Sequence, residues 1–115
     1  MQHFPWESIK KEIMNEKLSR RVVHGEKITV AQLHFIKGCS VPPHQHENEQ
    51  ISLVMEGAVK FNLGGQEVLA RAGDVVVIPP NLPHNVVVLE DTVVFDVFSP
   101  IRSDWIAGDD SYLRK

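Results

Sequence analysis

The sequence has only one cysteine, no large excess of either charge and no long apolar run. Cys39 is alone among 115 residues, so no disulfide can form within the chain, which fits a reducing compartment. A net charge of -3 at pH 7 argues against nucleic acid as a partner. No apolar run approaches the roughly 20 residues that span a bilayer, and the first residues lack the pattern of a signal peptide. We therefore expect a cytoplasmic protein that binds neither nucleic acid nor membranes.

Hydrophobic residues make up 43% of the chain, which is typical of a globular protein and not of a disordered one. At 115 residues the chain has the length of one domain with a modest core. We expect an N-terminal arm over residues 1–17, a barrel over residues 18–100 and a C-terminal tail over residues 101–115.

Short alternating or β-branched runs, separated by glycine and proline, follow one another through the middle of the chain. Every second residue from Thr29 to Phe35 falls on one face of such a run, as in a strand with two different sides. Gly64 and Gly65 predict a tight hairpin. The predicted strands cover residues 18–24, 28–36, 51–56, 58–63, 66–70, 74–78, 84–90 and 92–98. Eight strands at this spacing predict an all-β sandwich or small barrel.

The two ends of the chain are less regular. Ile9, Ile13 and Met14 have helical spacing, so a short helix is one interpretation of residues 8–17. A further strand, which could pair with a second subunit, is the other. The tail after Pro100 is polar with Trp105 as an apolar anchor, and we expect irregular structure or one helical turn there.

Two histidines stand one residue apart in the stretch PPHQHENEQISLVMEG. If residues 44–54 are extended, His44, His46 and Gln50 share one face, because every second side chain of a strand points the same way. Imidazole is the commonest ligand for divalent Zn, Fe, Ni and Cu. The pattern therefore favours a metal site, although two histidines in an exposed surface loop would give the same letters.

A third imidazole would complete such a set. His84 follows the turn PPNLP, and a proline-rich turn is stiff enough to hold a ligand in place. His84 is therefore the best candidate. The remaining histidines, His3, His24 and His34, are weaker ones.

The stretch TVVFDVFSPIRSDW places a carboxylate, Asp96, inside an otherwise apolar strand. An isolated buried carboxylate is costly, so Asp96 needs a partner, a nearby metal or a wet cavity. A carboxylate that lines a metal cavity is suited to general acid/base work. Phe98 shares its face, and Arg102 follows the strand with a guanidinium that could grip a substrate carboxylate through two hydrogen bonds. The alternatives are an edge strand with a solvated Asp96 and an ordinary surface arginine.

The two histidine-bearing stretches resemble the two motifs of the cupins. The first reads Gly38, five residues, His44-x-His46, three residues, Gln50, six residues and Gly57; the second reads GDVVVIPPNLPH, from Gly73 to His84. Fifteen residues separate the motifs, and the resemblance covers residues 25–100. It implies a single-domain cupin, a small β-barrel or jelly roll. Departures are Gln50 for the usual glutamate, Asn81 for a glycine and Val88 for an asparagine; asparagine can adopt the left-handed conformation that the glycine would have used.

The segment from Asp96 to Trp105 and the tail GDDSYL resemble the pectin degradation protein branch of the cupins, whose members also have glutamine in place of the glutamate. Ile101 departs from the proline that is common there. The branch linearises 4,5-unsaturated uronate monomers from pectin or alginate to the 5-keto-4-deoxyuronate. The resemblance implies an isomerase in which Asp96 is the catalytic acid/base and Arg102 and Phe98 line the pocket for a small acidic sugar. It also implies metal ligation by His44, His46, Gln50 and His84.

Three imidazoles and an amide carry no charge, so they leave the +2 charge of a divalent ion uncompensated. Such an ion is a stronger Lewis acid and favours an anionic substrate oxygen. No redox change is needed, so one Ni, Mn, Fe or Zn ion would serve. A metal-dependent dioxygenase, a non-catalytic module that binds metal or a sugar acid, and a metal-free barrel are the alternatives. We also expect a homodimer, formed through an exposed sheet face to which residues 51–55 contribute.

Overall fold

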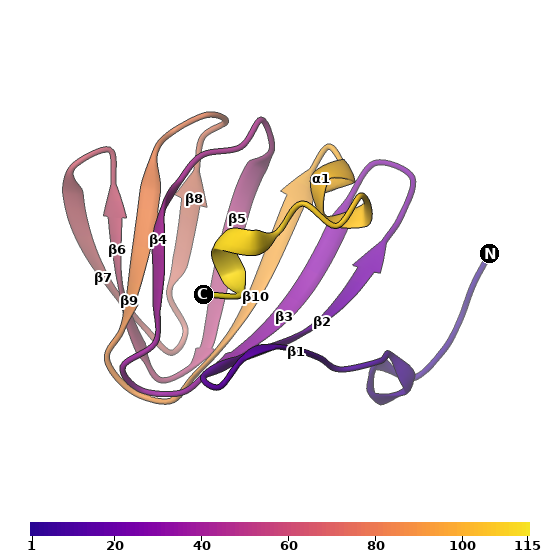
Figure 1. The fold of residues 1–115 in the computed structure, drawn as a ribbon, viewed down its shortest axis with the longest axis horizontal. Coiled ribbons are helices and arrows are strands. Elements are labelled where there is room, and N and C mark those ends of the chain that lie inside the picture. The colour runs from indigo at the N-terminus through magenta and orange to yellow at the C-terminus, as the bar shows by residue number, and fades with distance from the viewer.

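A computed structural model describes all residues, 1–115, as two antiparallel sheets that face each other (Figure 1). The six-stranded sheet has the order β1-β2-β3-β10-β5-β8, and the four-stranded sheet has the order β4-β9-β6-β7. The strands are β1 (Glu12–Asn15), β2 (Leu18–His24), β3 (Thr29–Phe35), β4 (Ser40–His44), β5 (Glu49–Glu56), β6 (Ala58–Leu63), β7 (Gln66–Arg71), β8 (Val75–Ile78), β9 (His84–Val88) and β10 (Thr92–Ser99). The expected all-β jelly roll is therefore confirmed.

The predicted alternation decides which side chains face the interior. Ala31, Leu33 and Phe35 of β3 are buried, and so are Val94 and Phe98 of β10. The intervening side chains lie on the outer face of the sheet and are partly exposed. The interior between the sheets is thus apolar on most sides, and the polar side chains within it stand out.

The N-terminal segment forms a strand and not the helix that the spacing of Ile9, Ile13 and Met14 allowed. β1 pairs with β2 of the same chain, so the strand alternative holds without a second subunit. Met14 is buried while Ile13 is exposed, which is the period of a strand. Glu12 pairs with Arg20 across the two strands, and only a short 3-10 helix, η1 (Trp6–Ser8), precedes them.

One strand of the four-stranded sheet, β4, was not among the predicted strands. The assumption of a continuous strand over residues 44–54 is also wrong, because β4 ends at His44 and β5 begins at Glu49. Pro42 and Pro43 hid the strand, since proline is rare in strands. β4 lies at an edge of its sheet, which is where a sheet accommodates proline.

Two positions show why the turns within the two motifs hold their shape. Asn81 has a φ of 63°, which confirms that it takes the left-handed conformation expected from the family pattern. Gly57 has a φ of 89°, and a Cβ there would lie 2.3 Å from the carbonyl oxygen of Asp91. Only glycine fits between these two chain segments.

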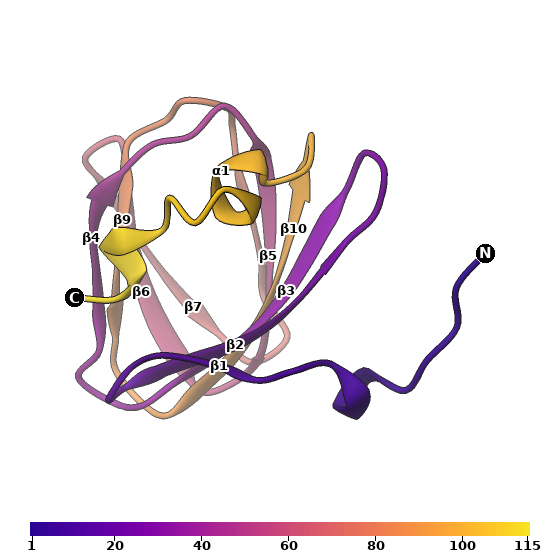
Figure 2. The ribbon, with the colours of Figure 1, turned by 45° about the vertical axis from the view of Figure 1, so that its right-hand side comes forward.

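The C-terminal segment crosses the open side of the barrel (Figure 2). It leaves β10, forms the four-residue helix α1 (Ser103–Ile106) and ends in the 3-10 helix η2 (Ser111–Leu113), which contacts β4. Asp110 attaches it to the barrel through an ion pair with Arg20 of β2, and Arg114 pairs with the same carboxylate from within the segment. The expected helical turn is present as α1, a second short helix follows it, and the segment closes one wall of the interior. No helix in the structure is long and apolar enough to cross a membrane.

Candidate functional site

The three histidines singled out in the sequence meet at one end of the barrel. His44 ends β4, His46 lies in the following turn and His84 begins β9, directly opposite His44 in the register of the two strands. Their potential ligand atoms all lie within 4.8 Å of one another. This is the one group in the chain that could hold a metal ion, so His3, His24 and His34 take no part in such a site. The expectation that His44, His46 and Gln50 lie on one side was reached by assuming one continuous strand. In the structure β4, the turn after it and β5 supply these residues.

Backbone carbonyls fix the orientation of each imidazole. Nδ1 lies 2.8 Å from the carbonyl oxygen of Pro42 in His44, 3.1 Å from that of Asn48 in His46 and 2.8 Å from that of Leu82 in His84. In each contact the ring donates its Nδ1 hydrogen, since a carbonyl can only accept. Nε2 then carries the lone pair, and this second-sphere bonding is the arrangement found in metal-ligating histidines.

Burial keeps these rings neutral. It lowers the pKa of His44 and of His46 to about 4, and it also lowers the pKa of His84. The positive charge of Arg102 adds to the effect at His46 and His84. Because a metal ion binds the neutral form of imidazole, no proton competes with it at neutral pH.

Two features show whether a metal ion fits this site: a buried nitrogen without a hydrogen-bond partner, and two acceptor atoms held close together. Nε2 of His84 is buried and has no hydrogen-bond partner. Nε2 of His46 lies 3.1 Å from Oε1 of Gln50, and two acceptors at that distance repel each other unless something positive lies between or beside them. A divalent cation would satisfy all three atoms, so the residues present fit a metal ion.

Gln50 is oriented by a chain of hydrogen bonds that leads away from the histidines. Its Nε2 donates to Oγ of Ser52 at 3.0 Å, and the Ser52 hydroxyl donates to Oδ1 of Asp96 at 2.6 Å. Because the Ser52 hydroxyl gives its only hydrogen to Asp96, it can accept from the amide nitrogen. The amide oxygen is thereby turned toward His46. Ser52 is fully buried, and sequence reasoning missed it, since only its position on the Gln50 face pointed to it.

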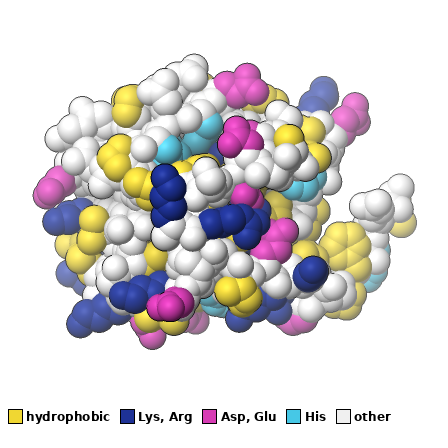
Figure 3. Space-filling model, viewed as in Figure 1, with side chains coloured by type: hydrophobic (Ala, Val, Ile, Leu, Met, Phe, Trp, Pro, Cys, Tyr) yellow, Lys and Arg dark blue, Asp and Glu magenta, His cyan; other side chains and the backbone are white.

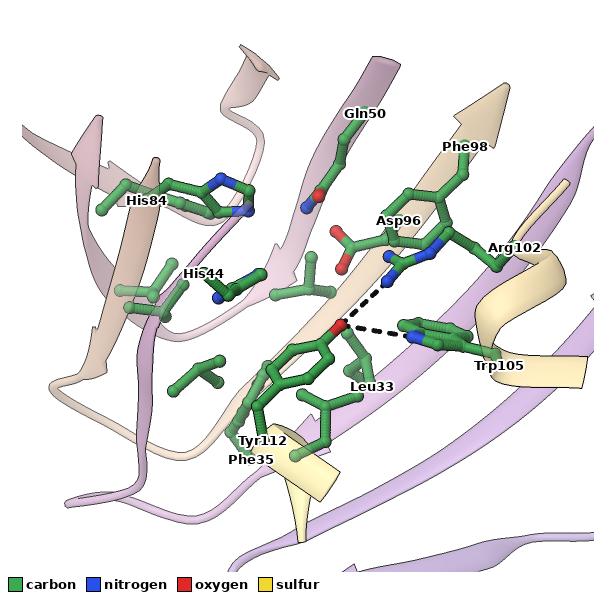
Figure 4. Close-up of a pocket in the computed structure, with 16 residues that line it drawn as sticks. Leu33, Phe35, His44, Gln50, His84, Asp96, Phe98, Arg102, Trp105 and Tyr112 are labelled. Carbon is green, nitrogen blue, oxygen red and sulfur yellow. Dashed lines mark hydrogen bonds between the residues drawn. The ribbon is translucent and has the colours of Figure 1, made fainter. Parts of the chain in front are cut away.

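Asp96 lies in the interior of the barrel, so the alternative of a solvated carboxylate on an edge strand is wrong. It is buried, and burial raises its pKa to about 6, against the opposing effects of the Ser52 hydroxyl and the Arg102 charge. The Gln50 amide also lowers this pKa, and the carboxyl group faces the cavity between Gln50 and Arg102 (Figure 4). A carboxyl with a pKa near neutrality can both accept and donate a proton.

Arg102 is fully buried, and its guanidinium is held more tightly than the sequence suggested. Asp104 accepts from Nε and Nη2 at 3.0 and 2.9 Å, and the Tyr112 hydroxyl accepts from Nη2 at 2.9 Å. Phe98 and Trp105 stack on the guanidinium, with ring centroids 4.6 and 4.2 Å from Cζ. The edge that could have gripped a substrate carboxylate is thus occupied by Asp104, and only Nη1 remains without a partner.

Tyr112 was not predicted to belong to the site. It comes from η2, stacks on His44 with centroids 4.5 Å apart, and accepts a second hydrogen bond from Nε1 of Trp105 at 3.2 Å. Burial raises the pKa of its hydroxyl. A tyrosine near the end of a polar tail gives no local signal, because only the return of the tail across the barrel brings it there.

His44, Gln50, His84, Asp96, Arg102 and Tyr112 line one cavity together with apolar side chains. Eleven of its sixteen lining residues are hydrophobic; the others include His44, Gln50, His84, Asp96 and Arg102. Histidine side chains reach the surface in a hollow near the upper centre of the face drawn in Figure 3. The cavity is therefore a mostly apolar pocket with a few convergent polar groups.

Comparison with known proteins agrees with this geometry. The cupin domain family matches residues 31–98, which is more than half of the chain, and the chain belongs to the cupin family. The structure of KdgF from a Halomonas species is 30% identical, with a TM-score of 0.84 over 91% of this chain and 98% of that one. The resemblance to the pectin degradation branch is thus matched by overall structural similarity. No curated protein matches the chain.

Two further structures extend the comparison. A RmlC-like cupin from Shewanella frigidimarina is 29% identical, with a TM-score of 0.84 over 91% of this chain and 96% of its own. The oxalate decarboxylase of Bacillus subtilis, which has Mn(II) centres, is 18% identical, with a TM-score of 0.75 over 90% of this chain and 33% of its own. The last likeness shows the fold alone.

Proposed function

We propose that this cupin is an isomerase that opens the ring of 4,5-unsaturated uronate monomers and gives the linear 5-keto-4-deoxyuronate. The similarity to KdgF and the family resemblance of the segment around Asp96 support this substrate class. The observation that carries the proposal is the buried Asp96 carboxyl, which faces the cavity that His44 and His84 also line.

His44, His46 and His84 would hold one divalent transition metal ion, Ni, Mn, Fe or Zn, and Gln50 would add an amide oxygen. Such an ion, when bound, polarises substrate oxygens. All four side chains are neutral, so a bound cation keeps its full +2 charge and complements an acidic sugar.

Asp96 would handle the protons of the reaction. As the carboxylate it accepts the proton of the anomeric hydroxyl. The C1–O5 bond then breaks, C1 becomes an aldehyde and O5 becomes the oxygen of an enolate at C5. Return of this proton from Asp96 to C4 turns the enolate into the C5 ketone. The reaction is an isomerisation, so Asp96 ends in its starting state. A pKa of about 6 places both of its protonation states within reach at neutral pH.

Arg102 and Phe98 would position the substrate. Phe98 packs against the guanidinium and against His46, so it fixes Arg102 relative to the histidines. The free Nη1 of Arg102 offers a charge-assisted hydrogen bond to the substrate carboxylate. Closure of this apolar pocket around the sugar would exclude bulk water from the reacting atoms.

The test follows the loss of the conjugated absorbance of unsaturated galacturonate. The monomer also opens spontaneously, so the quantity of interest is the rate above a protein-free control containing the same metal ion. We expect wild type to accelerate the decay and Asp96→Asn to lose at least about 100-fold of that acceleration while still binding metal. Gln50→Ala should lose metal affinity as well as rate. Decay by wild-type protein at the control rate would refute the isomerase.

Two other outcomes would identify the alternatives. Oxygen consumption with an aromatic or thiol substrate, and no effect on uronates, would favour a dioxygenase. Saturable binding of a sugar acid without turnover, unchanged in Asp96→Asn, would favour a binding module.

We also propose that the chain forms a homodimer through the outer face of the six-stranded sheet. Met55 of β5 and Val75 and Val77 of β8 are each more than half exposed there, and these two strands are neighbours. An apolar group of this kind at a sheet edge is suited to an interface with a second copy.

A further inference from the structure

Tyr112 has a hydroxyl group whose hydrogen bonds are only partly accounted for by the protein. Its oxygen accepts from Nη2 of Arg102 and from Nε1 of Trp105, as the dashed lines in Figure 4 show. Neither partner can accept a hydrogen bond in return, because guanidinium and indole nitrogens are donors only. No protein acceptor lies within hydrogen-bond distance of the Tyr112 hydroxyl, so its own hydrogen has no partner.

The direction of this unused donor follows from the same contacts. A hydroxyl has one hydrogen and two lone pairs, and both lone pairs of Tyr112 are engaged. The remaining position of the oxygen faces the cavity that Tyr112 lines together with Arg102, Asp96 and His44. The tyrosine cannot turn away, since its ring is stacked on His44.

Arg102 has few hydrogen-bond donors left for a ligand. Its Nε and one hydrogen of Nη2 are taken by Asp104, and the other hydrogen of Nη2 goes to Tyr112. The outer edge of the guanidinium therefore offers the hydrogens of Nη1 but none of Nη2. At that corner the Tyr112 hydroxyl, 2.9 Å from Nη2, is the next available donor.

We propose that Tyr112 is a substrate-binding residue, and that its hydroxyl and Nη1 of Arg102 together bind the two oxygens of the sugar carboxylate. This inference rests on the proposed function, because it assigns the carboxylate of that substrate class to a subsite. These two donors replace the bidentate hydrogen bonding of a carboxylate by the guanidinium, which Asp104 prevents. It also gives the C-terminal segment a role in recognition, since η2 carries Tyr112 to the barrel.

The first test uses the wild-type chain, because Tyr112 is its only tyrosine. Labelling with ¹³Cζ-tyrosine gives a single resonance, which reports on the hydroxyl of Tyr112 alone. We expect galacturonate, added in the presence of Zn²⁺, to shift this resonance, and galactose, which has no carboxylate, to leave it in place. An equal shift with both sugars, or no shift at saturating galacturonate, would overturn the proposal.

The second test compares two variants. Tyr112→Phe keeps the ring on His44 and removes the hydroxyl, so we expect galacturonate affinity to fall roughly 10-fold, the value of a hydrogen bond to a charged group. Asn15→Ala removes the amide of β1 that donates to the carbonyl oxygens of Leu113 and Lys115 in the tail. It does not touch the cavity and should keep wild-type affinity. An equal loss in both variants would mean that Tyr112 only fastens the tail.

Neither test depends on turnover, because galacturonate lacks the 4,5 double bond. A tyrosine shift without acceleration of uronate decay would keep the carboxylate subsite and reject the isomerase. Acceleration of uronate decay without a shift of the tyrosine resonance would keep the isomerase and reject the carboxylate subsite at Tyr112.

Discussion

The buried carboxyl of Asp96 makes a quantitative prediction about stability and pH. Its pKa is about 6 in the folded protein against an ordinary value of 3.8, so the folded state holds this proton more tightly than the unfolded state does. A difference of about two units corresponds to about 3 kcal/mol, at 1.36 kcal/mol per unit. The sign follows directly: the contribution of Asp96 to stability is lost as the pH rises from about 4 to about 6, and the full cost remains at higher pH.

Asp96→Asn removes this titration while keeping the size of the side chain. We expect the unfolding free energy of the variant, minus that of wild type, to increase by up to about 3 kcal/mol between pH 4 and pH 8. His44 and His46 have lowered pKa values and make both proteins less stable as the pH falls below about 6.5. This trend is common to both proteins, so the difference between them isolates Asp96.

The assay is urea unfolding at a series of pH values with a chelator present, so that no metal ion changes the charge of the cavity. Asparagine also alters the contact with Ser52, which shifts the unfolding free energy of the variant by a constant amount. The test is therefore how the free-energy difference between variant and wild type changes with pH, and not its value at any one pH. A difference that stays constant from pH 4 to pH 8 would refute the claim that Asp96 is buried with a raised pKa.

Four further predictions concern the metal site and the outer sheet. Because the pKa values of His44 and His46 are about 4, the Zn²⁺ affinity of Asp96→Asn, which lacks the carboxyl group that titrates near pH 6, should stay constant from pH 8 to about 5 in chelator competition. A fall beginning near pH 6.5, the ordinary value of histidine, would contradict this prediction. His84→Ala should weaken Zn²⁺ binding by roughly 100-fold or more, since even second-sphere changes cost 10–100-fold. Gln50→Glu should strengthen Zn²⁺ binding, and it should slow uronate decay because the added negative charge makes the bound ion a weaker Lewis acid. Val77→Asp should convert a dimer to a monomer in light scattering, and an unchanged mass would refute the proposed interface.

Much of the site was predictable because strand period and motif spacing are local properties. The alternation around Asp96 placed it with Phe98 on one face, and the interior of the barrel is on that face. The spacing of the two motifs picked out His44, His46 and His84, which the structure brings together. β4 was missed because its prolines mask it, and the continuous strand over residues 44–54 was wrong because local period cannot show where a chain turns.

The chemistry of the cavity was less accessible to such reasoning. Whether Arg102 has a free edge depends on Asp104, which lies two residues away and turns toward it only in the helical start of the tail. Ser52 could be placed on the face of Gln50, but its bond to Asp96 depends on the pairing of β5 with β10.

The sequence by itself determined the all-β architecture, the two histidine motifs and the single carboxylate in an apolar strand. These are consequences of which residue types recur at which intervals. Only the tertiary structure decided the protonation of that carboxylate, the direction of the imidazole lone pairs and the place of Tyr112 in the cavity. The reason is physical: a pKa and a hydrogen bond depend on the atoms within a few ångströms, and in this fold those atoms come from strands and a tail that are far apart in the chain.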